Sequence, residues 1–154
     1  MAGLWAYNSI FALTKSIAQK GHKISFVSTP RNIDRLPRIP LHLVSSITLL
    51  KISLPKVEGL PESAEATMDI GNEDIPYLKK AFHGMETGLT RFLDESRPDW
   101  IIYDFTPHWL PPIPARLGIS RATFRAVSAW FLAFFGPSET MINGLDERKK
   151  WKTS

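Results

Sequence analysis

The 154-residue chain is 44% hydrophobic and 22% charged, a composition that fits one globular domain and excludes an intrinsically disordered protein. The absence of cysteine excludes a disulfide framework, a thiolate metal site and a cysteine nucleophile. The net charge of +4 comes from dispersed Lys and Arg residues, so nucleic acid is not an expected partner, and no apolar stretch reaches the roughly 20 residues that span a bilayer.

The first part of the sequence predicts a helix followed by a strand. Its opening residues are apolar, but no basic segment precedes them and Asn8 and Ser9 interrupt them, which argues against a secretory signal and for a cytoplasmic protein. Apolar residues then recur with helical spacing over Ser9–Lys20, and Gly21 is expected to end this helix. The β-branched and aromatic run KISFVS (Lys23–Ser28) predicts a strand.

The middle of the sequence predicts a second strand and a long helix. We expect a short helical turn near Asn32–Leu36 and a strand over Ile47–Ile52, followed by a loop rich in Pro, Gly and Glu at Lys56–Asn72. Apolar residues occupy one broad helical face over Pro76–Asp94. Two glycines inside this predicted helix each weaken it by about 1 kcal/mol relative to alanine.

The last part again alternates strands and helices. The apolar run WIIY (Trp100–Tyr103) is typical of a strand buried in a parallel sheet. A short helix near Ile113–Leu117, a strand at Ala122–Val127 and a helix at Ser128–Phe135 are expected to follow. Strands separated by helices predict an α/β fold with a parallel sheet. The first strand of such a sheet is missing or degraded, unless Gly3–Tyr7 is a stub of it.

Asp104 is the leading candidate for a functional residue. It follows the Trp100–Tyr103 strand directly, and ligands of open α/β sheets bind at the carboxyl ends of strands. A carboxylate there can orient a His, bind a cation or act as a base, and the alternative is an Asp that forms a turn or caps a helix. His108, four residues later, could line a pocket or be structural. No His pair has the spacing of metal ligands, and no glycine-rich phosphate loop occurs.

Four continuous stretches carry a family resemblance: KSIAQKGHKISFVSTPRNIDRLPRIP (Lys15–Pro40), LPESAEATMDI (Leu60–Ile70), IPYLKKAF (Ile75–Phe82) and PDWIIYDFTPHWLPPIPARLGISRATF (Pro98–Phe124). They resemble plant UDP-dependent glycosyltransferases of carbohydrate-enzyme family 1, in the flavonoid or soyasaponin rhamnosyl- or glucosyltransferase-like branch. The resemblance implies a GT-B fold, in which two Rossmann-like halves of parallel sheet and flanking helices face each other. Residues 1–154 would form a single incomplete N-terminal, acceptor-side domain, and the C-terminal donor-binding domain is absent.

The resemblance also implies a reaction and its residues. Such enzymes move a sugar from a UDP-sugar to a hydroxyl of a small plant metabolite or its glycoside by inverting displacement, with UDP-sugar as co-substrate and without a metal or redox cofactor. Asp104 falls on the catalytic Asp that orients a His base. Phe105, His108 and Trp109 fall in a loop that lines the acceptor pocket, and Ser128 falls near a position that contacts the donor sugar.

The sequence departs from this pattern at the base. Counting back from Lys15 places the base His at about Ala6, and no His precedes His22. We therefore expect this chain alone to be inactive, whatever the family activity. The expected partners are a small hydrophobic acceptor, such as a flavonoid or triterpenoid glycoside, and a donor-binding domain supplied elsewhere. The alternative is a non-catalytic small-molecule-binding module or a regulatory remnant that interacts with a full-length relative.

Overall fold

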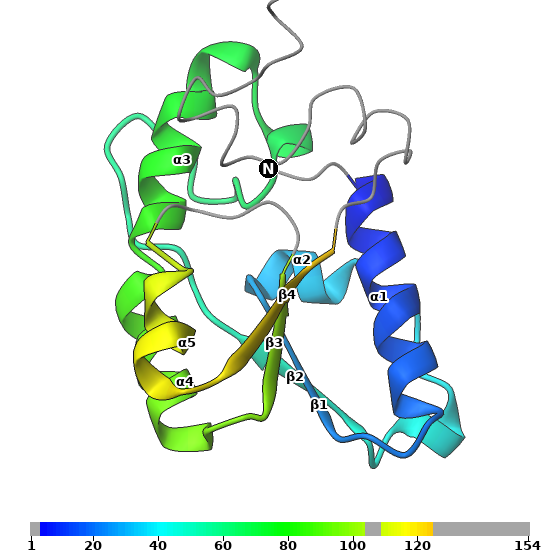
Figure 1. Cartoon of the computed structure of the whole chain (residues 1–154). Coiled ribbons are helices and arrows are strands. Elements are labelled where there is room, and N and C mark those ends of the chain that lie inside the picture. The colour runs from blue at the N-terminus through cyan, green and yellow to red at the C-terminus, as the bar shows by residue number, and fades with distance from the viewer. Residues whose placement is uncertain (1–3, 104–108, 125–154) are drawn as a thin grey trace, which may run out of the picture. The chain divides into compact units, whose positions relative to one another are not determined.

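Two pairs of parallel strands organise the protein (Figure 1). The structure is a computed structural model that describes residues 4–103 and 109–124. Strand β1 (Ile24–Ser28) pairs in parallel with β2 (Ile47–Lys51), and β3 (Trp100–Tyr103) pairs in parallel with β4 (Ser120–Thr123). The prediction of an α/β fold with parallel strands is confirmed.

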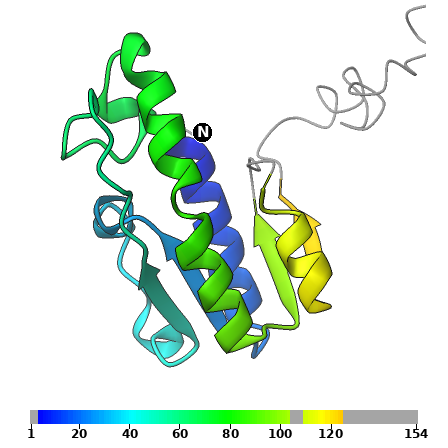
Figure 2. The same cartoon turned by 90° about the vertical axis from the view of Figure 1, so that its left-hand side faces the viewer.

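Helices make every connection between these strands. Helix α1 (Leu4–Ala18) precedes β1, and the short α2 (Pro30–Asp34) leads from β1 toward β2. Helices α3 (Ile75–His83) and α4 (Glu86–Ser96) lie between β2 and β3 and follow one another nearly end to end (Figure 2). Helix α5 (Pro112–Leu117) joins β3 to β4. Three single turns of 3-10 helix complete the elements: η1 (Leu41–Leu43), η2 (Thr67–Asp69) and η3 (Asn72–Asp74).

The single helix expected over Pro76–Asp94 is wrong, because the chain forms two helices that meet at Gly84 and Met85. Gly84 caps α3 and donates its N–H to the carbonyl of Ala81, and the N–H of Met85 donates to the carbonyl of Phe82. The ring of Pro55 lies so close to Gly84 that a Cβ atom there would overlap Pro55 Cγ. The glycine is therefore required for packing.

We expect Gly84→Ala to lower the free energy of unfolding by about 1–3 kcal/mol, the usual cost of overpacking. Helix propensity alone predicts the opposite sign, since alanine is favoured over glycine by about 1 kcal/mol inside a helix. Urea unfolding followed by circular dichroism measures the difference, with the exposed Thr87→Ala of α4 as the matched control. A Gly84→Ala variant as stable as the wild type would contradict this account.

Each pair of strands has its own hydrophobic core. Around β1 and β2, the buried residues Ala18, Leu43 and Ile47 pack together, and the ring of Phe11 in α1 meets that of Phe26 in β1 edge to face at 5.3 Å. Around β3 and β4, the second cluster joins α4 and α5 and consists of Leu93, Trp109, Leu110, Ile113 and Ile119. Each core thus lies between one pair of strands and the helices packed on it, which are α1 and η1 for the first core and α4 and α5 for the second.

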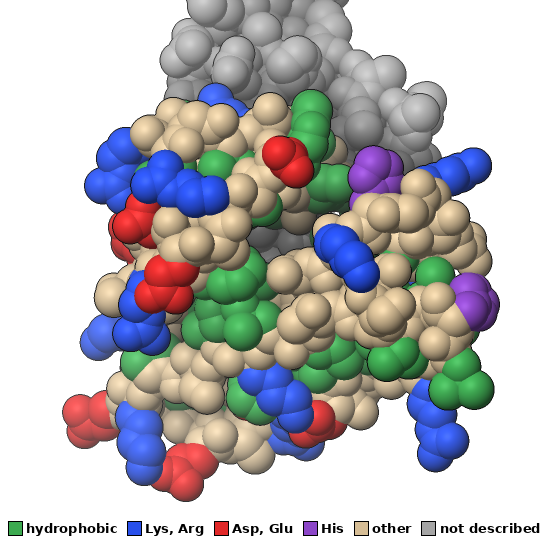
Figure 3. Space-filling model, turned by 90° about the horizontal axis from the view of Figure 1, so that it is seen from below, with side chains coloured by type: hydrophobic (Ala, Val, Ile, Leu, Met, Phe, Trp, Pro, Cys, Tyr) green, Lys and Arg blue, Asp and Glu red, His purple; other side chains and the backbone are tan. Residues whose placement is uncertain are grey.

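The stub expected at Gly3–Tyr7 is wrong for the described residues, because Leu4–Tyr7 begin helix α1. Among residues 4–103 and 109–124, no strand joins the β1–β2 pair to the β3–β4 pair. The run Trp100–Tyr103 is also not covered on both faces. Ile101 and Tyr103 pack on the second core, whereas Trp100 and Ile102 are exposed. Hydrophobic side chains accordingly reach the surface at the end where the strands begin (Figure 3).

Two further boundaries differ from expectation. Helix α2 begins at Pro30 rather than near Asn32, because proline suits the first turn of a helix, where its missing N–H costs nothing. Strand β4 ends at Thr123, so only part of the expected strand Ala122–Val127 lies within it. The expected helix Ser128–Phe135 lies outside the described residues.

Candidate functional site

The carboxyl ends of the parallel strands form the candidate site, since this is where open α/β sheets bind ligands. Strands β1 and β2 end in register at Ser28 and Lys51, and β3 and β4 end in register at Tyr103 and Thr123. Asp104, Phe105 and His108 follow β3 in the sequence and lie outside the described residues, as does Ser128. Of the predicted site residues, the structure therefore describes Trp109.

Trp109 lies in the second hydrophobic core, between the loop that follows β3 and helix α5. Its side chain is 8% exposed, it packs with Leu93 and Leu110, and its ring centroid lies 6.5 Å from that of Phe82 in α3. Its indole Nε1 has no hydrogen-bond partner among the described residues. A buried donor without a partner is uncommon in folded proteins, so this N–H is available to an acceptor atom at the site.

Thr29 is a second buried polar residue at a carboxyl end, and it was not among the site residues predicted from the sequence. It follows β1 directly and precedes α2, yet its Oγ1 has no hydrogen-bond partner among the described residues. Its position after a predicted strand is the signal that singled out Asp104 and could have identified Thr29 as well. Both strand pairs thus carry an unpaired polar group near the ligand-binding edge.

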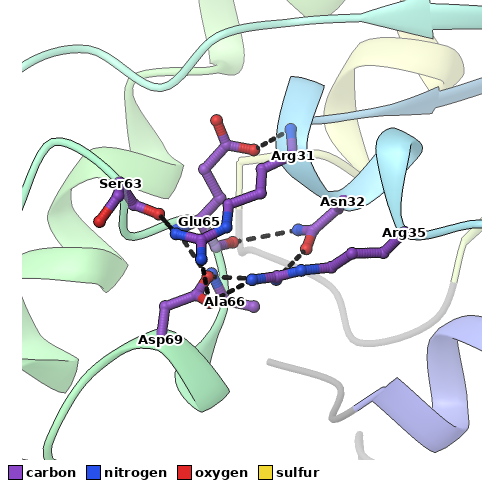
Figure 4. A network of polar contacts seen from close by, with 7 residues as sticks. All are labelled: Arg31, Asn32, Arg35, Ser63, Glu65, Ala66 and Asp69. Atoms are coloured by element: carbon purple, nitrogen blue, oxygen red, sulfur yellow. Dashed lines mark hydrogen bonds and ion pairs between the residues drawn. The ribbon is translucent and has the colours of Figure 1, made fainter.

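Beside the carboxyl end of β1, helix α2 holds the segment Ser63–Asp69 through a polar network (Figure 4). The backbone N–H of Arg31 donates to Glu65 Oε2 at 2.6 Å, and its guanidinium donates to the Ser63 carbonyl. Asn32 Nδ2 donates to the Glu65 carbonyl at 3.1 Å. These contacts join residues more than 30 positions apart. They fix part of the loop expected at Lys56–Asn72 against the strand end.

Asp69 is the centre of this network and is 5% exposed at its side chain. The guanidinium of Arg35 donates to both carboxylate oxygens, and the backbone N–H groups of Glu65 and Ala66 donate to Oδ2 at 3.1 and 2.9 Å. Burial by itself raises the pKa of Asp69, but the hydrogen bonds from Arg35 and the two N–H groups outweigh it and lower that pKa below 3.8. Asp69 is therefore held as a carboxylate.

The excess of Lys and Arg was predicted to be dispersed charge on the solvated surface, and for Arg35 this is wrong. Arg35 is half-buried against Asp69, and Arg31 Nη2 lies 3.7 Å from Asp69 Oδ1. His22 lies exposed between α1 and β1, at the amino end of the strand. His22 is therefore remote from the carboxyl ends of the strands.

Neither a metal centre nor a membrane span is found in the described part of the chain. No group of three or more His, Cys, Asp or Glu residues within it could hold a metal ion. No helix within residues 4–103 and 109–124 combines the length and the apolar character needed to cross a bilayer.

Comparison with known proteins places these features in a family context, although no protein-family model matches the sequence. The chain is 55% identical to UDP-glycosyltransferase 91D2 of Stevia rebaudiana over 137 residues. This aligned segment covers 88% of this chain and 28% of that protein. It is 43% identical over 127 residues to soyasaponin III rhamnosyltransferase of Glycine max, and this match covers 82% of this chain and 27% of that protein. The chain thus spans less than a third of the length of these curated relatives.

Solved structures show the same fold. The Glycyrrhiza uralensis enzyme UGT73P12, complexed with glycyrrhetinic acid 3-O-monoglucuronide, matches with a TM-score of 0.65 at 23% identity, over 76% of this chain and 25% of that one. Arabidopsis thaliana UGT89C1, complexed with UDP-L-rhamnose, matches with a TM-score of 0.64 at 22% identity, over 76% of this chain and 32% of that one. At these identities the match establishes the fold alone, which is part of a Rossmann-like half of the GT-B type.

Proposed function

We propose that this chain, which is homologous over most of its length to a segment of plant UDP-glycosyltransferases, supplies the acceptor-binding part of such an enzyme. The 55% identity over 137 residues to UDP-glycosyltransferase 91D2 carries the proposal. Because the chain spans 28% of that relative, the proposal assigns UDP-sugar binding to protein outside these residues. The 154 residues by themselves are then inactive.

The proposed reaction is an inverting displacement. A hydroxyl oxygen of the acceptor forms a bond to the anomeric carbon as the bond from that carbon to UDP breaks, and the hydroxyl proton passes to a His base. Asp104 accepts a hydrogen bond from this His and stabilises the imidazolium that forms, as in hydrolase triads. No His precedes His22 in this sequence, so in this proposal the chain itself lacks the base. No metal or redox cofactor takes part.

The proposed acceptor is a small hydrophobic plant metabolite or its glycoside, of the flavonoid or triterpenoid class. In support, one relative is a soyasaponin III rhamnosyltransferase, and solved structures of similar fold hold glycyrrhetinic acid 3-O-monoglucuronide or quercetin. In this proposal, Phe105, His108 and Trp109 bind the acceptor, and Ser128 contacts the donor sugar. The unpaired indole N–H of Trp109 supports its part, because an oxygen of the acceptor would satisfy that buried donor.

Trp109→Phe is expected to weaken acceptor binding about fivefold, the worth of one neutral hydrogen bond. The phenyl ring keeps much of the packing against Phe82 and Leu93, so folding should persist. Isothermal titration of the chain with a flavonoid glycoside and a triterpenoid glycoside measures the affinities, with the exposed Trp100→Phe as the matched control. Failure of the wild-type chain to bind either class, or equal affinities for both variants, would contradict the acceptor assignment.

The purified 154-residue chain is expected to transfer no radiolabelled sugar from any UDP-sugar to these glycosides. The physical reason is that, in this proposal, the chain lacks both the donor site and the His base. Full-length UDP-glycosyltransferase 91D2 in the same assay is the positive control. Measurable transfer by the isolated chain would show that these residues contain a complete catalytic site.

A further inference from the structure

The first third of the chain concentrates its positive charge. Residues 1–51 contain seven Lys and Arg and a single acidic residue, Asp34, whereas residues 52–154 contain twelve Lys and Arg and fourteen Asp and Glu. Asp34 is itself engaged with Lys51, whose Nζ lies 2.6 Å from Asp34 Oδ1. The modest net charge of the whole chain therefore hides a region of +6 beside one of −2.

Several of these cations lie together at the end of the molecule where β1 and β2 begin. Lys23 Nζ donates to the carbonyl of Ser45 at 2.7 Å, and Ala18 at the end of α1 packs on Leu43. These contacts hold the turn after α1 beside the loop that carries η1, as both ribbon views show (Figures 1 and 2). None of the ion pairs among the described residues includes Lys20 or Lys23.

Two large apolar side chains project from this same loop. Leu41 is 93% exposed and Val44 is 54% exposed, although Leu43 between them is buried in the first core. Hydrogen bonds from Leu43 N to the Pro40 carbonyl, at 2.8 Å, and from Ser46 N to the Leu43 carbonyl, at 2.9 Å, fix the turn. The loop is therefore anchored at Leu43, and the side chains of Leu41 and Val44 are held exposed to solvent.

We call this region the basal surface and define it by its exposed residues Lys20, His22, Lys23, Arg38, Leu41 and Val44. Figure 3 looks onto this end of the molecule: on one side Lys, Arg and His side chains border hydrophobic ones, and on the opposite side acidic side chains lie among further Lys and Arg side chains. Cations around projecting aliphatic side chains match the two parts of an anionic bilayer interface, phosphate headgroups above acyl chains.

We propose that the basal surface docks on an anionic membrane, with Leu41 and Val44 entering the interface and the surrounding cations lying against lipid phosphates. Charge complementarity selects this occupant, and the aliphatic character of the projecting residues favours it over RNA, since a single-stranded nucleic acid would need aromatic side chains on which bases stack. The carboxyl ends of β1 and β2 lie at the other end of these strands. Docking therefore leaves the candidate site open to small molecules.

Vesicle flotation tests the proposal with the 154-residue chain and two kinds of vesicle, phosphatidylcholine alone and phosphatidylcholine with about 30% phosphatidylserine. We expect binding to the anionic vesicles only. Lys20→Gln and Arg38→Gln should each weaken it about fivefold, and Leu41→Ser with Val44→Ser should weaken it at least about tenfold. These side chains are exposed, so circular dichroism should show an unchanged fold. The exposed controls Lys79→Gln and Met68→Ser, away from this surface, should bind as the wild type does.

Three results would overturn the proposal. Equal binding to neutral and anionic vesicles would remove the role of charge, and wild-type binding by the Leu41→Ser, Val44→Ser variant would remove the role of insertion. Absence of vesicle binding together with polyuridine binding that Lys20→Gln and Arg38→Gln weaken would assign the surface to nucleic acid.

Discussion

Asp104→Asn is expected to slow sugar transfer about 10³–10⁴-fold in a chimera of this chain with UDP-glycosyltransferase 91D2. In the chimera, residues 15–124 replace the matching segment of that relative, which keeps its own preceding segment, where the family's base His is expected, and its own remaining length. Asparagine preserves the size of the side chain but removes the charge that stabilises the imidazolium, and it favours the wrong tautomer of the His. The loss should therefore appear in kcat, with the KM for the acceptor little changed.

Asp99→Asn is the matched control for this experiment. Asp99 precedes β3 and is exposed, at the opposite end of the strand from Asp104. Its replacement should leave kcat within about twofold, since the residue lies at the end of the strand away from the ligand-binding edge. Equal losses for the two variants, or an Asp104→Asn chimera that keeps a tenth of its activity, would remove Asp104 from the proposed mechanism.

Asp69→Asn is expected to lower the free energy of unfolding by about 2–3 kcal/mol at neutral pH. The change leaves the half-buried guanidinium of Arg35 without its counter-charge and weakens two hydrogen bonds from the backbone. Urea unfolding measures it. The control is Asp34→Asn, which removes an exposed ion pair with Lys51 and should change stability by less than about 0.5 kcal/mol. Equal effects of the two substitutions would contradict the central place of Asp69 in the network.

The contribution of Asp69 to the free energy of unfolding should also depend on pH, and it should decrease as the pH falls. Its pKa is lower in the folded state than its ordinary value of 3.8, so the unfolded chain takes up the proton first as the pH falls. The stabilisation is therefore complete above that value and is lost as the pH falls toward the folded pKa. The stability difference between wild type and Asp69→Asn should shrink between about pH 5 and pH 3. A difference that stays constant over this range would show that the carboxylate charge is not its source.

The strands were predictable because their signal is local. The run Trp100–Tyr103 coincides with β3, and Lys23–Ser28 includes all of β1, since β-branched and aromatic runs bounded by turns specify strands without help from distant residues. The break at Gly84 was not predictable, because apolar periodicity continues through it. The contact with Pro55 that requires the glycine joins residues 29 positions apart.

The candidate site likewise combines features that a local sequence pattern predicts with features that depend on distant residues. The position of Asp104 directly after a predicted strand is a local pattern, and so is that of Thr29, which the same rule would have found. The pairing of Arg35 with Asp69 links residues 34 positions apart and leaves no local pattern. The only hint was opposite charge, with Arg residues around α2 and acidic residues in the later loop. The burial of Trp109 depends on α4 and α5, which its own proline-rich loop does not reveal.

Sugar transfer by the unsubstituted chimera tests the central claim most directly. If residues 15–124 form the acceptor-binding part of a UDP-glycosyltransferase, the chimera should move radiolabelled sugar from a UDP-sugar to a flavonoid or triterpenoid glycoside. Its rate should be no less than about a tenth of that of the parent enzyme, since a segment 55% identical to the one it replaces should hold the reacting groups in the same alignment. A chimera that folds, as judged by circular dichroism, and binds its UDP-sugar, yet transfers no sugar to any of these acceptors, would contradict the account.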